Sequence, residues 1–223
     1  MPGSVSPRHP TKRHPLLHRA FFRADPLDCA RQLVGTELIW GECAGIVVET
    51  EAYLTENDEA CHCFNRASTR AFVARNKPGA AYIYLNYGVH WMLNVLVKGG
   101  ARDGLILIRA IEPTRGINRM RLRRGADDVR RLCSGPGKLT QALNITRQHH
   151  EMDLCAGRGY GFAPANSGAV DVIADERIGI TRAAELPWRF TLRDSRFVSR
   201  PVKKRSRPRE RITRAQKPLI KAN

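Results

Sequence analysis

A pair of acidic side chains, Glu49 and Glu51, stands one residue apart in the segment GIVVETEAY at 45–53. The segment is rich in β-branched residues and predicts a strand, in which side chains two positions apart share a face at about 6.5 to 7 Å. Glycoside hydrolysis uses paired carboxylates near that spacing. Val47 and Tyr53 share the face and suit the wall of a cleft, and a simply solvated face is the alternative.

The segment YIYLNYGVHWMLNV at 82–95 predicts a hairpin that concentrates tyrosines. Tyr82 and Tyr84 point the same way from its first strand, and Tyr87 stands in the turn, where a polar residue is usual. An exposed turn aromatic can enter a base stack, and base–aromatic stacking is worth about 1 to 3 kcal/mol. Tyr87 is therefore a candidate nucleic-acid contact, unless it folds back onto the sheet.

Two polar residues fall inside or at the end of apolar runs, Asn94 in WMLNVLV and Arg109 in LILIR. A buried amide without partners costs about 1 to 3 kcal/mol. Asn94 therefore either bonds a neighbouring backbone group or selects what enters a pocket. A buried cation needs an anionic partner, and Glu51 or a phosphate would serve Arg109.

The segment SGPGKL at 134–139 predicts the start of a helix, with Ser134 as its cap and Pro136 in its first turn. Its backbone amides and Lys138 could meet a phosphate there. The segment CHC at 61–63 invites a metal interpretation, but no second ligand pair follows at zinc-site spacing. We expect no metal and no cofactor. The six cysteines lack CxxC spacing, and we expect reduced thiols.

Length and composition favour one domain, since 223 residues with 42% apolar content can build a single substantial core. The net charge of +17 is concentrated at the ends, with +10 from residue 196 onward and +4 in residues 1–20. Such ends attract polyanions with salt-sensitive affinity, so nucleic acid is the leading partner and a solubilising tail is the alternative. Neither a signal peptide nor a membrane-spanning run is seen, which predicts a cytoplasmic protein.

Turn and capping residues, together with the spacing of apolar residues, predict the helices and strands along the chain. A helix is expected at 24–35, a long loop or short helix at 55–80, a basic helix from Pro113 to Gly125 and a helix after Ser134. Strands are expected at 36–40, 45–53, 81–85, 90–97, 105–113, 171–181 and 188–193. Hairpins mixed with separate helices indicate the α+β class.

Five segments stand together in this order along the chain: VVETEAYLTENDEACH, KPGAAYIYLNYGVHWMLNV, LIRAIEP, LCSGPGKLTQAL and RIGIT. With them the chain resembles the alkyladenine (3-methyladenine) DNA glycosylase family, of the mammalian alkyladenine type, from about Phe21 to Val198. The resemblance implies a monofunctional hydrolase of base-excision repair. Such an enzyme flips 3-methyladenine, 7-methylguanine, hypoxanthine or ethenoadenine out of duplex DNA and leaves an abasic site.

The resemblance implies roles at matching positions. Glu51 corresponds to the general base that activates water for attack at C1′ of the flipped nucleotide, and Arg109 and the backbone carbonyl of Ile178 hold that water. Lys138, with Gly137 beside it, corresponds to a contact with the DNA backbone. Tyr53, His62 and Tyr84 correspond to the residues that sandwich and hydrogen-bond the damaged base. Asn94 corresponds to the asparagine that opposes the 2-amino group of guanine, and Tyr87 to the aromatic residue that fills the gap in the base stack.

The fold expected with this resemblance is a single α+β domain, with a curved, mostly antiparallel sheet, a protruding β-hairpin and surrounding helices. We expect a flexible basic arm at 1–20, the glycosylase domain at 21–200 and a basic, disordered tail at 201–223. The expected partner is double-stranded DNA with damaged purines, bound by a monomer that associates with the nucleoid if the source is bacterial.

The chain departs from the family pattern at 66–71, at 98–104, around the CHC segment and at Val89. Two other functions stay open from the residues alone. One is a nucleic-acid-binding protein without catalysis. The other is a metal-dependent hydrolase or deaminase built on CHC, although the zinc-deaminase signature is missing from the chain.

Overall fold

The computed structural model describes residues 15–157, 159–164, 168 and 170–202. Most of the expected N-terminal arm and nearly all of the expected C-terminal tail lie outside the described residues. The described end of the arm contacts the domain, because the Leu17 amide donates to the Phe162 carbonyl at 2.6 Å and Arg19 pairs with Asp153 at 2.5 Å.

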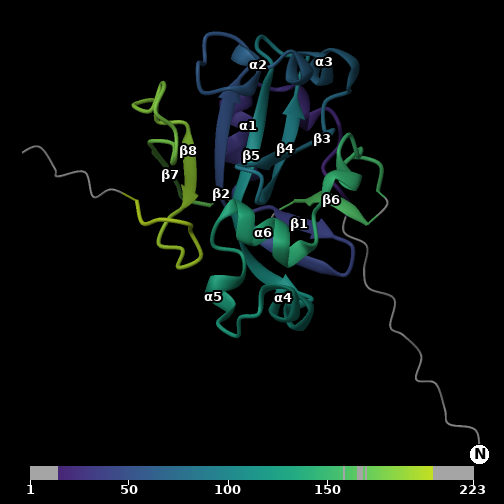
Figure 1. Cartoon of the computed structure of the whole chain (residues 1–223), viewed down its shortest axis with the longest axis vertical. Coiled ribbons are helices and arrows are strands. Elements are labelled where there is room, and N and C mark those ends of the chain that lie inside the picture. The colour runs from purple at the N-terminus through teal and green to yellow at the C-terminus, as the bar shows by residue number, and fades with distance from the viewer. Residues whose placement is uncertain (1–14, 158, 165–167, 169, 203–223) are drawn as a thin grey trace, which may run out of the picture.

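The described strands form one curled antiparallel sheet (Figure 1), which confirms the expected α+β fold of a single domain. Its main path runs β3-β4-β5-β2-β1-β6, while β8 pairs with both β2 and β7. The strands are β1 (Glu37–Trp40), β2 (Cys43–Leu54), β3 (Ala81–Asn86), β4 (His90–Val97), β5 (Gly104–Arg115), β6 (Tyr160–Ala163), β7 (Val172–Asp175) and β8 (Arg189–Leu192).

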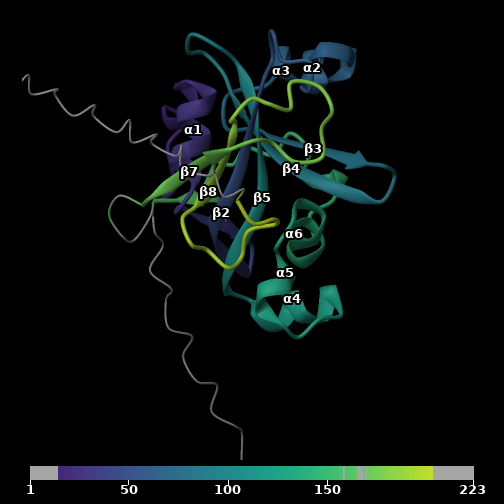
Figure 2. The same ribbon diagram turned by 90° about the vertical axis from the view of Figure 1, so that its left-hand side faces the viewer.

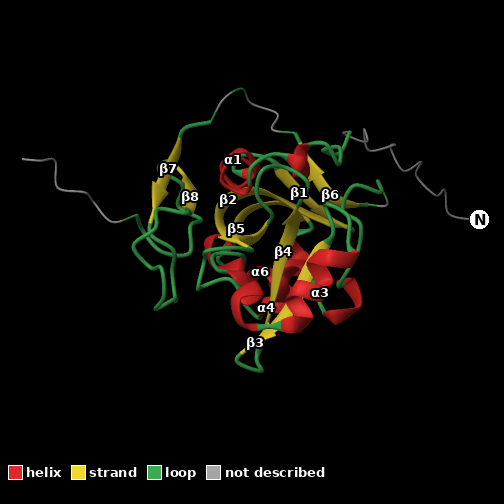
Figure 3. Ribbon diagram, turned by 90° about the horizontal axis from the view of Figure 1, so that it is seen from above, coloured by secondary structure: helices red, strands yellow, loops and turns green. Residues whose placement is uncertain are grey.

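The described helices surround this sheet, and Figure 3 shows α1 on the opposite side of the strands from α3, α4 and α6. They are α1 (Pro26–Leu33), α2 (His62–Asn65), α3 (Ala67–Arg75), α4 (Ile117–Arg124), α5 (Val129–Leu132) and α6 (Pro136–Leu143), with the 3-10 turns η1 (Phe21–Arg23) and η2 (Arg147–His149). None of the helices in the described ranges has both the length and the apolar character needed to cross a bilayer.

The helix predicted at 24–35 forms for the expected reason. The Asp25 side chain accepts the Leu27 amide hydrogen at 2.9 Å, and Pro26 occupies the first turn. Cys29, Ala30 and Leu33 are buried on its inner face. The helix therefore begins and ends where its capping residues predict.

The predicted basic helix begins later than expected. Pro113 lies in β5, opposite Gly45, at a register shift where the missing proline N–H interrupts no regular ladder. The helix starts only at Ile117, after Gly116 has taken a left-handed φ of 74°. Placing Pro113 at the helix start was wrong, because a strand bulge accommodates this proline.

Three other expectations about elements were wrong in part. Ser134 does not cap α6, since the N-cap is Gly135 without a side-chain cap, and Ser134 instead bridges to Ala110 of β5. The region 55–80 contains both α2 and α3 rather than one short helix. The strand expected at 171–181 ends at Asp175, and the chain then turns toward β2.

The pairing of β2 with β5 controls where the acidic pair points. Register shifts occur between Val47 and Glu49 and again between Glu49 and Thr50. Val47 consequently packs in the main core with Ala52, so the expectation that Val47 flanks the acids on their own face was wrong. Glu49 and Glu51 still lie together, because both bond to Arg109 of β5.

The β3–β4 hairpin projects from the body of the domain, as Figure 2 shows. Its inner end is held by the pairing of β4 with β5, from Asn94 opposite Leu107 to Val97 opposite Gly104. Its outer end carries the turn with Tyr87. The protruding hairpin expected from the resemblance is therefore present, and one edge of the cavity described below lies along it.

Candidate active site

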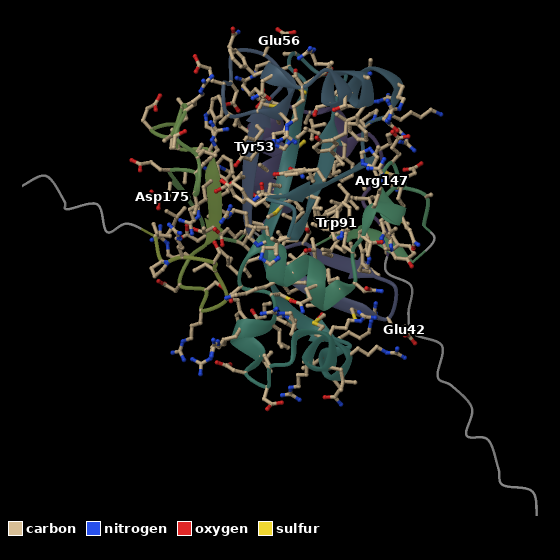
Figure 4. All side chains as sticks on the ribbon, in the orientation of Figure 1. Glu42, Tyr53, Glu56, Trp91, Arg147 and Asp175 are labelled. Carbon is tan, nitrogen blue, oxygen red and sulfur yellow. The ribbon has the colours of Figure 1, made fainter. Side chains whose placement is uncertain are left out.

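A cavity of about 510 Å³ opens between β2, the β3–β4 hairpin, β5, α2 and the loop after β7. Its volume falls within the range of about 300 to 1,000 Å³ typical of small-molecule sites. Figure 4 places Tyr53, one of its lining residues, near the middle of the molecule. The sequence-predicted residues that line the cavity are Tyr53, His62, Tyr84, Tyr87, Asn94, Arg109 and Ile178.

Glu51 is fully buried directly behind this wall. Its Oε2 accepts hydrogen bonds from the Tyr53 hydroxyl at 2.7 Å and from Arg109 Nη1 at 3.2 Å, and its Oε1 accepts one from the Ile178 amide at 2.7 Å. All three partners line the cavity. A carboxylate accepts about four hydrogen bonds, so Oε1 of Glu51 keeps one acceptor position.

Glu49 is also fully buried, and its carboxylate is saturated. Its Oε1 accepts from Arg109 Nε at 3.2 Å, Arg189 Nε at 2.7 Å and Ser199 Oγ at 2.8 Å, and its Oε2 accepts from the Ser199 amide at 2.5 Å. Among the described residues, Glu49 accepts four hydrogen bonds and Glu51 three, and of the two acids it is Glu51 whose partners all line the cavity.

The protonation of this cluster follows from burial and charge. Burial raises the pKa of Glu51 above its ordinary value, against the opposing effects of the Arg109 charge, the Ile178 amide and the Tyr53 hydroxyl. Burial, and then the neighbouring charge of Glu51, raises the pKa of Tyr53 well above its ordinary value. Tyr53 therefore stays protonated and donates to Glu51.

Aromatic rings form the side walls of the cavity. His62 and Tyr84 meet edge to face with centroids 4.3 Å apart. The Tyr53 ring is covered by the Arg177 guanidinium, whose carbon lies 4.6 Å from the ring centroid. Burial, with the nearby charge of Arg66, lowers the pKa of His62 to about 4, so this imidazole is neutral at pH 7.

Asn94 is 3% exposed and lines the cavity from β4. Its Nδ2 donates to the Tyr82 carbonyl at 3.2 Å, so its amide has a fixed partner on the neighbouring strand. The bond to a neighbouring backbone group, one of the two alternatives considered for this residue, is present, and selection of what enters the cavity stays a prediction.

Tyr87 is 88% exposed at the tip of the hairpin. Tyr87 and Gly88 have φ values of 49° and 69°, and the Val89 amide donates to the Asn86 carbonyl at 3.1 Å, which closes a tight turn of the mirror-image type found in hairpins. The left-handed conformation costs a non-glycine residue about 1 to 2 kcal/mol. Tyr87 does not fold back onto the sheet.

The start of α6 lies beside the hairpin. Pro136 lines the cavity, and Lys138, two residues further along α6, is exposed. A Cβ on Gly137 would lie 2.8 Å from Cγ of His90, so close packing against β4 explains the glycine at this position. Contact of Lys138 and Gly137 with a DNA backbone stays a prediction.

Several residues at the site were not assigned to it from the sequence. The cavity is also lined by Ala60, Cys61, Arg66, Tyr82, Leu85, Asn86, Met92, Leu105, Leu107, Pro136, Gly179 and Ile180. Asp58 and Arg177 form a fully buried, two-bond ion pair behind Tyr53. The alternation of β3, which places Tyr82 beside Tyr84, was the available signal for Tyr82.

The cysteines of the CHC segment pack inside the domain. Cys61 and Cys63 are buried in a cluster with Phe72 and Tyr82, and all six cysteines are free. Within the described ranges, no group of three or more His, Cys, Asp or Glu side chains is arranged to hold a metal ion. The geometry thus offers no ligand set for the metal-dependent alternative in this part of the chain.

The chain was compared with known proteins. The sequence profile of the family described as Methylpurine-DNA glycosylase (MPG) matches residues 20–196. A protein of Rhodopseudomonas palustris (strain HaA2), named "Putative 3-methyladenine DNA glycosylase", is 43% identical over 91% of this chain and 100% of its own length. A relative of the same name from Agrobacterium fabrum is 43% identical over 83% of this chain and 93% of its own length. The resemblance found in the sequence is confirmed, and the chain belongs to the methylpurine-DNA glycosylase family, whose members hydrolyse N-glycosyl bonds.

Proposed function

We propose that the protein removes alkylated or deaminated purines from duplex DNA by flipping the damaged nucleotide into the cavity and hydrolysing its N-glycosyl bond. The observation that carries this proposal is the environment of Glu51. Three groups that line the cavity donate to its carboxylate, and one acceptor position on Oε1 is left for a water molecule.

In the proposed reaction, Glu51 accepts a proton from the water as the water oxygen forms a bond to C1′ and the bond from C1′ to the base nitrogen breaks. The ionised carboxylate also stabilises the positive charge that develops on the sugar. Arg109 and the backbone of Ile178 hold the water beside Glu51. A water nucleophile, with no lysine Schiff base, leaves an abasic site without strand cleavage.

Base recognition is proposed to use the aromatic walls. A purine would stack between Tyr53 on one side and the His62–Tyr84 pair on the other. N3- or N7-alkylated purines are cationic, so they gain from tyrosine faces and depart as neutral bases without acid catalysis. Hypoxanthine and ethenoadenine are neutral and must gain a proton on leaving. His62 stays neutral at pH 7 and can donate one ring N–H hydrogen bond.

Selection and DNA contact are proposed to come from the residues around the cavity. Asn94 would oppose the 2-amino group of guanine, and Tyr87 would occupy the gap left by the flipped nucleotide. Lys138 and Gly137 at the start of α6 would contact the DNA backbone. The proposed functional unit is a monomer on duplex DNA.

The experiment that tests the function compares Glu51→Gln with the wild-type protein on duplexes carrying 3-methyladenine, 7-methylguanine, hypoxanthine or ethenoadenine, with alkaline cleavage to reveal abasic sites. Glu51→Gln should bind these duplexes normally and release bases more slowly by about 10²-fold or more. The matched control is Glu56→Gln, because Glu56 is exposed and Figure 4 shows it at the outer end of the molecule, away from Tyr53. Equal rates of release in both variants would refute the role of Glu51, and no release of any tested base by the wild-type protein would favour a binding protein without catalysis.

A further inference from the structure

Glu49, the first acid of the ETE motif at 49–51, is the centre of a buried network that reaches Ser199 near the end of the domain. Glu49 joins four elements, because its carboxylate bonds to Arg109 of β5, to Arg189 of β8 and to Ser199, which follows β8. Whereas all three partners of Glu51 line the cavity, two of the partners of Glu49, Arg189 and Ser199, do not. A buried, saturated carboxylate at this place needs a role other than proton transfer.

Arg109 is held from two directions by the two acids. Its Nη1 donates to Glu51, its Nε donates to Glu49 and its Nη2 lies 3.4 Å from Ser199 Oγ. The guanidinium is planar and its donors have fixed directions. Anchoring Nε on Glu49 therefore fixes the direction in which Nη1 approaches Glu51.

The segment at 195–200 is attached to the same acid near its C-terminal end, directly through Ser199 and indirectly through Arg189. Ser199 donates to Glu49 through its amide and its hydroxyl, while Arg189 bonds Glu49 with Nε and the Arg200 carbonyl with Nη2, at 2.7 Å and 2.5 Å. A Cβ on Gly135 would lie 4.0 Å from Ser199 Cβ, which places this segment against the start of α6. Figure 2 shows the yellow C-terminal segment running past β2 and β5 toward α6.

We propose that Glu49 and Ser199 form a positioning pair that fixes Arg109 beside Glu51, so that the segment at 195–200 completes the active site. This inference rests on the proposed function, in which Arg109 holds the attacking water. Neither residue touches the reacting atoms. Loss of the pair should slow the chemical step and leave DNA binding unchanged, because Arg109 shifts while the cavity walls and the hairpin stay in place.

The test uses the full-length protein and four variants, Glu49→Gln, Ser199→Ala, Ser199→Thr and Ser195→Ala. Ser199→Ala removes one hydroxyl donor, and Ser199→Thr restores it. Ser195→Ala is the matched control in the same segment, because the Ser195 hydroxyl accepts from the Phe197 amide at 3.3 Å and, within the described residues, takes no part in the hydrogen bonds around Glu49. For each variant we measure the single-turnover rate of base release, the affinity for a duplex with a stable abasic-site analogue, and the thermal unfolding midpoint.

We expect Glu49→Gln to slow base release by about 10²-fold and Ser199→Ala by about 10-fold, since a misplacement of about 1 Å in a catalytic group costs on that scale. Ser199→Thr and Ser195→Ala should match the wild type, and the affinity for the abasic duplex should be unchanged throughout. Wild-type release by a folded Ser199→Ala would overturn the proposal. Glu49→Gln places an NH₂ group opposite donors whose hydrogen bonds Glu49 accepts, so this variant can fail to fold. In that case the comparison of Ser199→Ala with Ser199→Thr decides.

A readout without catalysis separates this proposal from the proposed function. The Nε–H resonance of Arg109, assigned by its loss in Arg109→Lys, should shift in Ser199→Ala and stay unchanged in Ser195→Ala. An unshifted resonance would refute the positioning role whatever the enzyme activity. A shifted resonance in a protein that releases none of the tested bases would refute the proposed function and leave the positioning of Arg109 standing.

Discussion

The hydroxyl of Tyr53 donates to Oε2 of Glu51 at 2.7 Å. The two residues lie two positions apart in β2 and share one face, so the side chain that forms one wall of the cavity also donates a hydrogen bond to the buried carboxylate behind it. The proposed stacking surface and the proposed catalytic carboxylate are thereby linked by one side chain. The hydroxyl and the ring of Tyr53 can be separated by a substitution that removes only the oxygen.

Tyr53→Phe should move the pH dependence of base release. Burial raises the pKa of Glu51, and the Tyr53 hydrogen bond lowers it, so removing the hydroxyl raises this pKa further. The reactive form of Glu51 is ionised and exists above its pKa. The acid limb of the single-turnover rate should therefore lie above the ordinary range of a glutamate in the wild type, and at still higher pH in Tyr53→Phe.

The control for this measurement is Tyr82→Phe. The Tyr82 hydroxyl bonds Thr69 at 2.8 Å and contacts His62 at 3.3 Å, and it has no contact with Glu51. Its acid limb should coincide with that of the wild type. If Tyr53→Phe leaves the limb unmoved or lowers it, Glu51 is not the group whose ionisation limits the reaction.

Local sequence signals predicted much of the fold. Asp25 and Pro26 define the start of α1, and β-branched runs with turn residues define both long hairpins. The failures occur where a long-range contact overrides a local preference. Pro113 is an acceptable helix start in isolation, and its place in β5 depends on the bulge opposite Gly45, which only the paired strand reveals.

The site was predicted to the same extent. Side-chain type and spacing, with the family resemblance, predicted Glu51, Arg109 and the tyrosines, because each of these departs from its local pattern. Arg109 and the tyrosines line the cavity and Glu51 lies behind it, while their roles stay predictions. The supporting residues Ser199 and Arg177 lie 150 and 119 positions from their acidic partners. Nothing in the local sequence of either residue indicates such a partner, so these ion pairs and hydrogen bonds follow only from the packed structure.

Asn94→Ser should weaken discrimination against undamaged guanine. The shorter side chain removes volume beside the cavity, where the asparagine amide is fixed by the Tyr82 carbonyl. A pocket that excludes a substrate by one small group typically discriminates by about 1 to 3 kcal/mol, so release of guanine relative to hypoxanthine should rise by about 10-fold or more. Unchanged selectivity would remove Asn94 as a specificity residue.

The control variant for Asn94→Ser is Asn76→Ser. Asn76 Nδ2 donates to the Phe72 carbonyl after α3, and Asn76 does not line the cavity. This variant makes the same chemical change at a distance from the cavity and should keep wild-type selectivity. Altered selectivity in both variants would attribute the effect to the general stability of the domain.

Tyr87→Ser should weaken binding to lesion-containing duplexes by about 1 to 3 kcal/mol, the value of one base–aromatic stack. The domain should lose no stability, because Tyr87 is 88% exposed and makes no core contact. Fluorescence anisotropy with a duplex that carries a stable abasic-site analogue measures the affinity. Leu122→Ser on α4 is the control, since Leu122 is 84% exposed and lies away from the hairpin. Equal affinities of both variants would exclude a wedge role for Tyr87.

Asp58→Asn should destabilise the whole domain and also slow base release. Asp58 and Arg177 are fully buried and joined by two hydrogen bonds, at 2.7 Å and 2.9 Å, and the loop that Arg177 anchors presents the Ile178 amide to Glu51. Removing one partner of a buried pair leaves an uncompensated charge and costs about 3 to 5 kcal/mol.

The neighbouring residue Glu59 supplies the matched control for Asp58→Asn. Glu59 pairs with Arg182 at 3.7 Å, and both side chains are more than half exposed. An exposed pair contributes about 0 to 1 kcal/mol because water screens it, so Glu59→Gln should unfold in urea at nearly the wild-type midpoint. If Asp58→Asn shares that midpoint, burial of the Asp58–Arg177 pair does not hold the loop. If it unfolds earlier but releases bases at the wild-type rate, the loop holds Ile178 beside Glu51 without that pair.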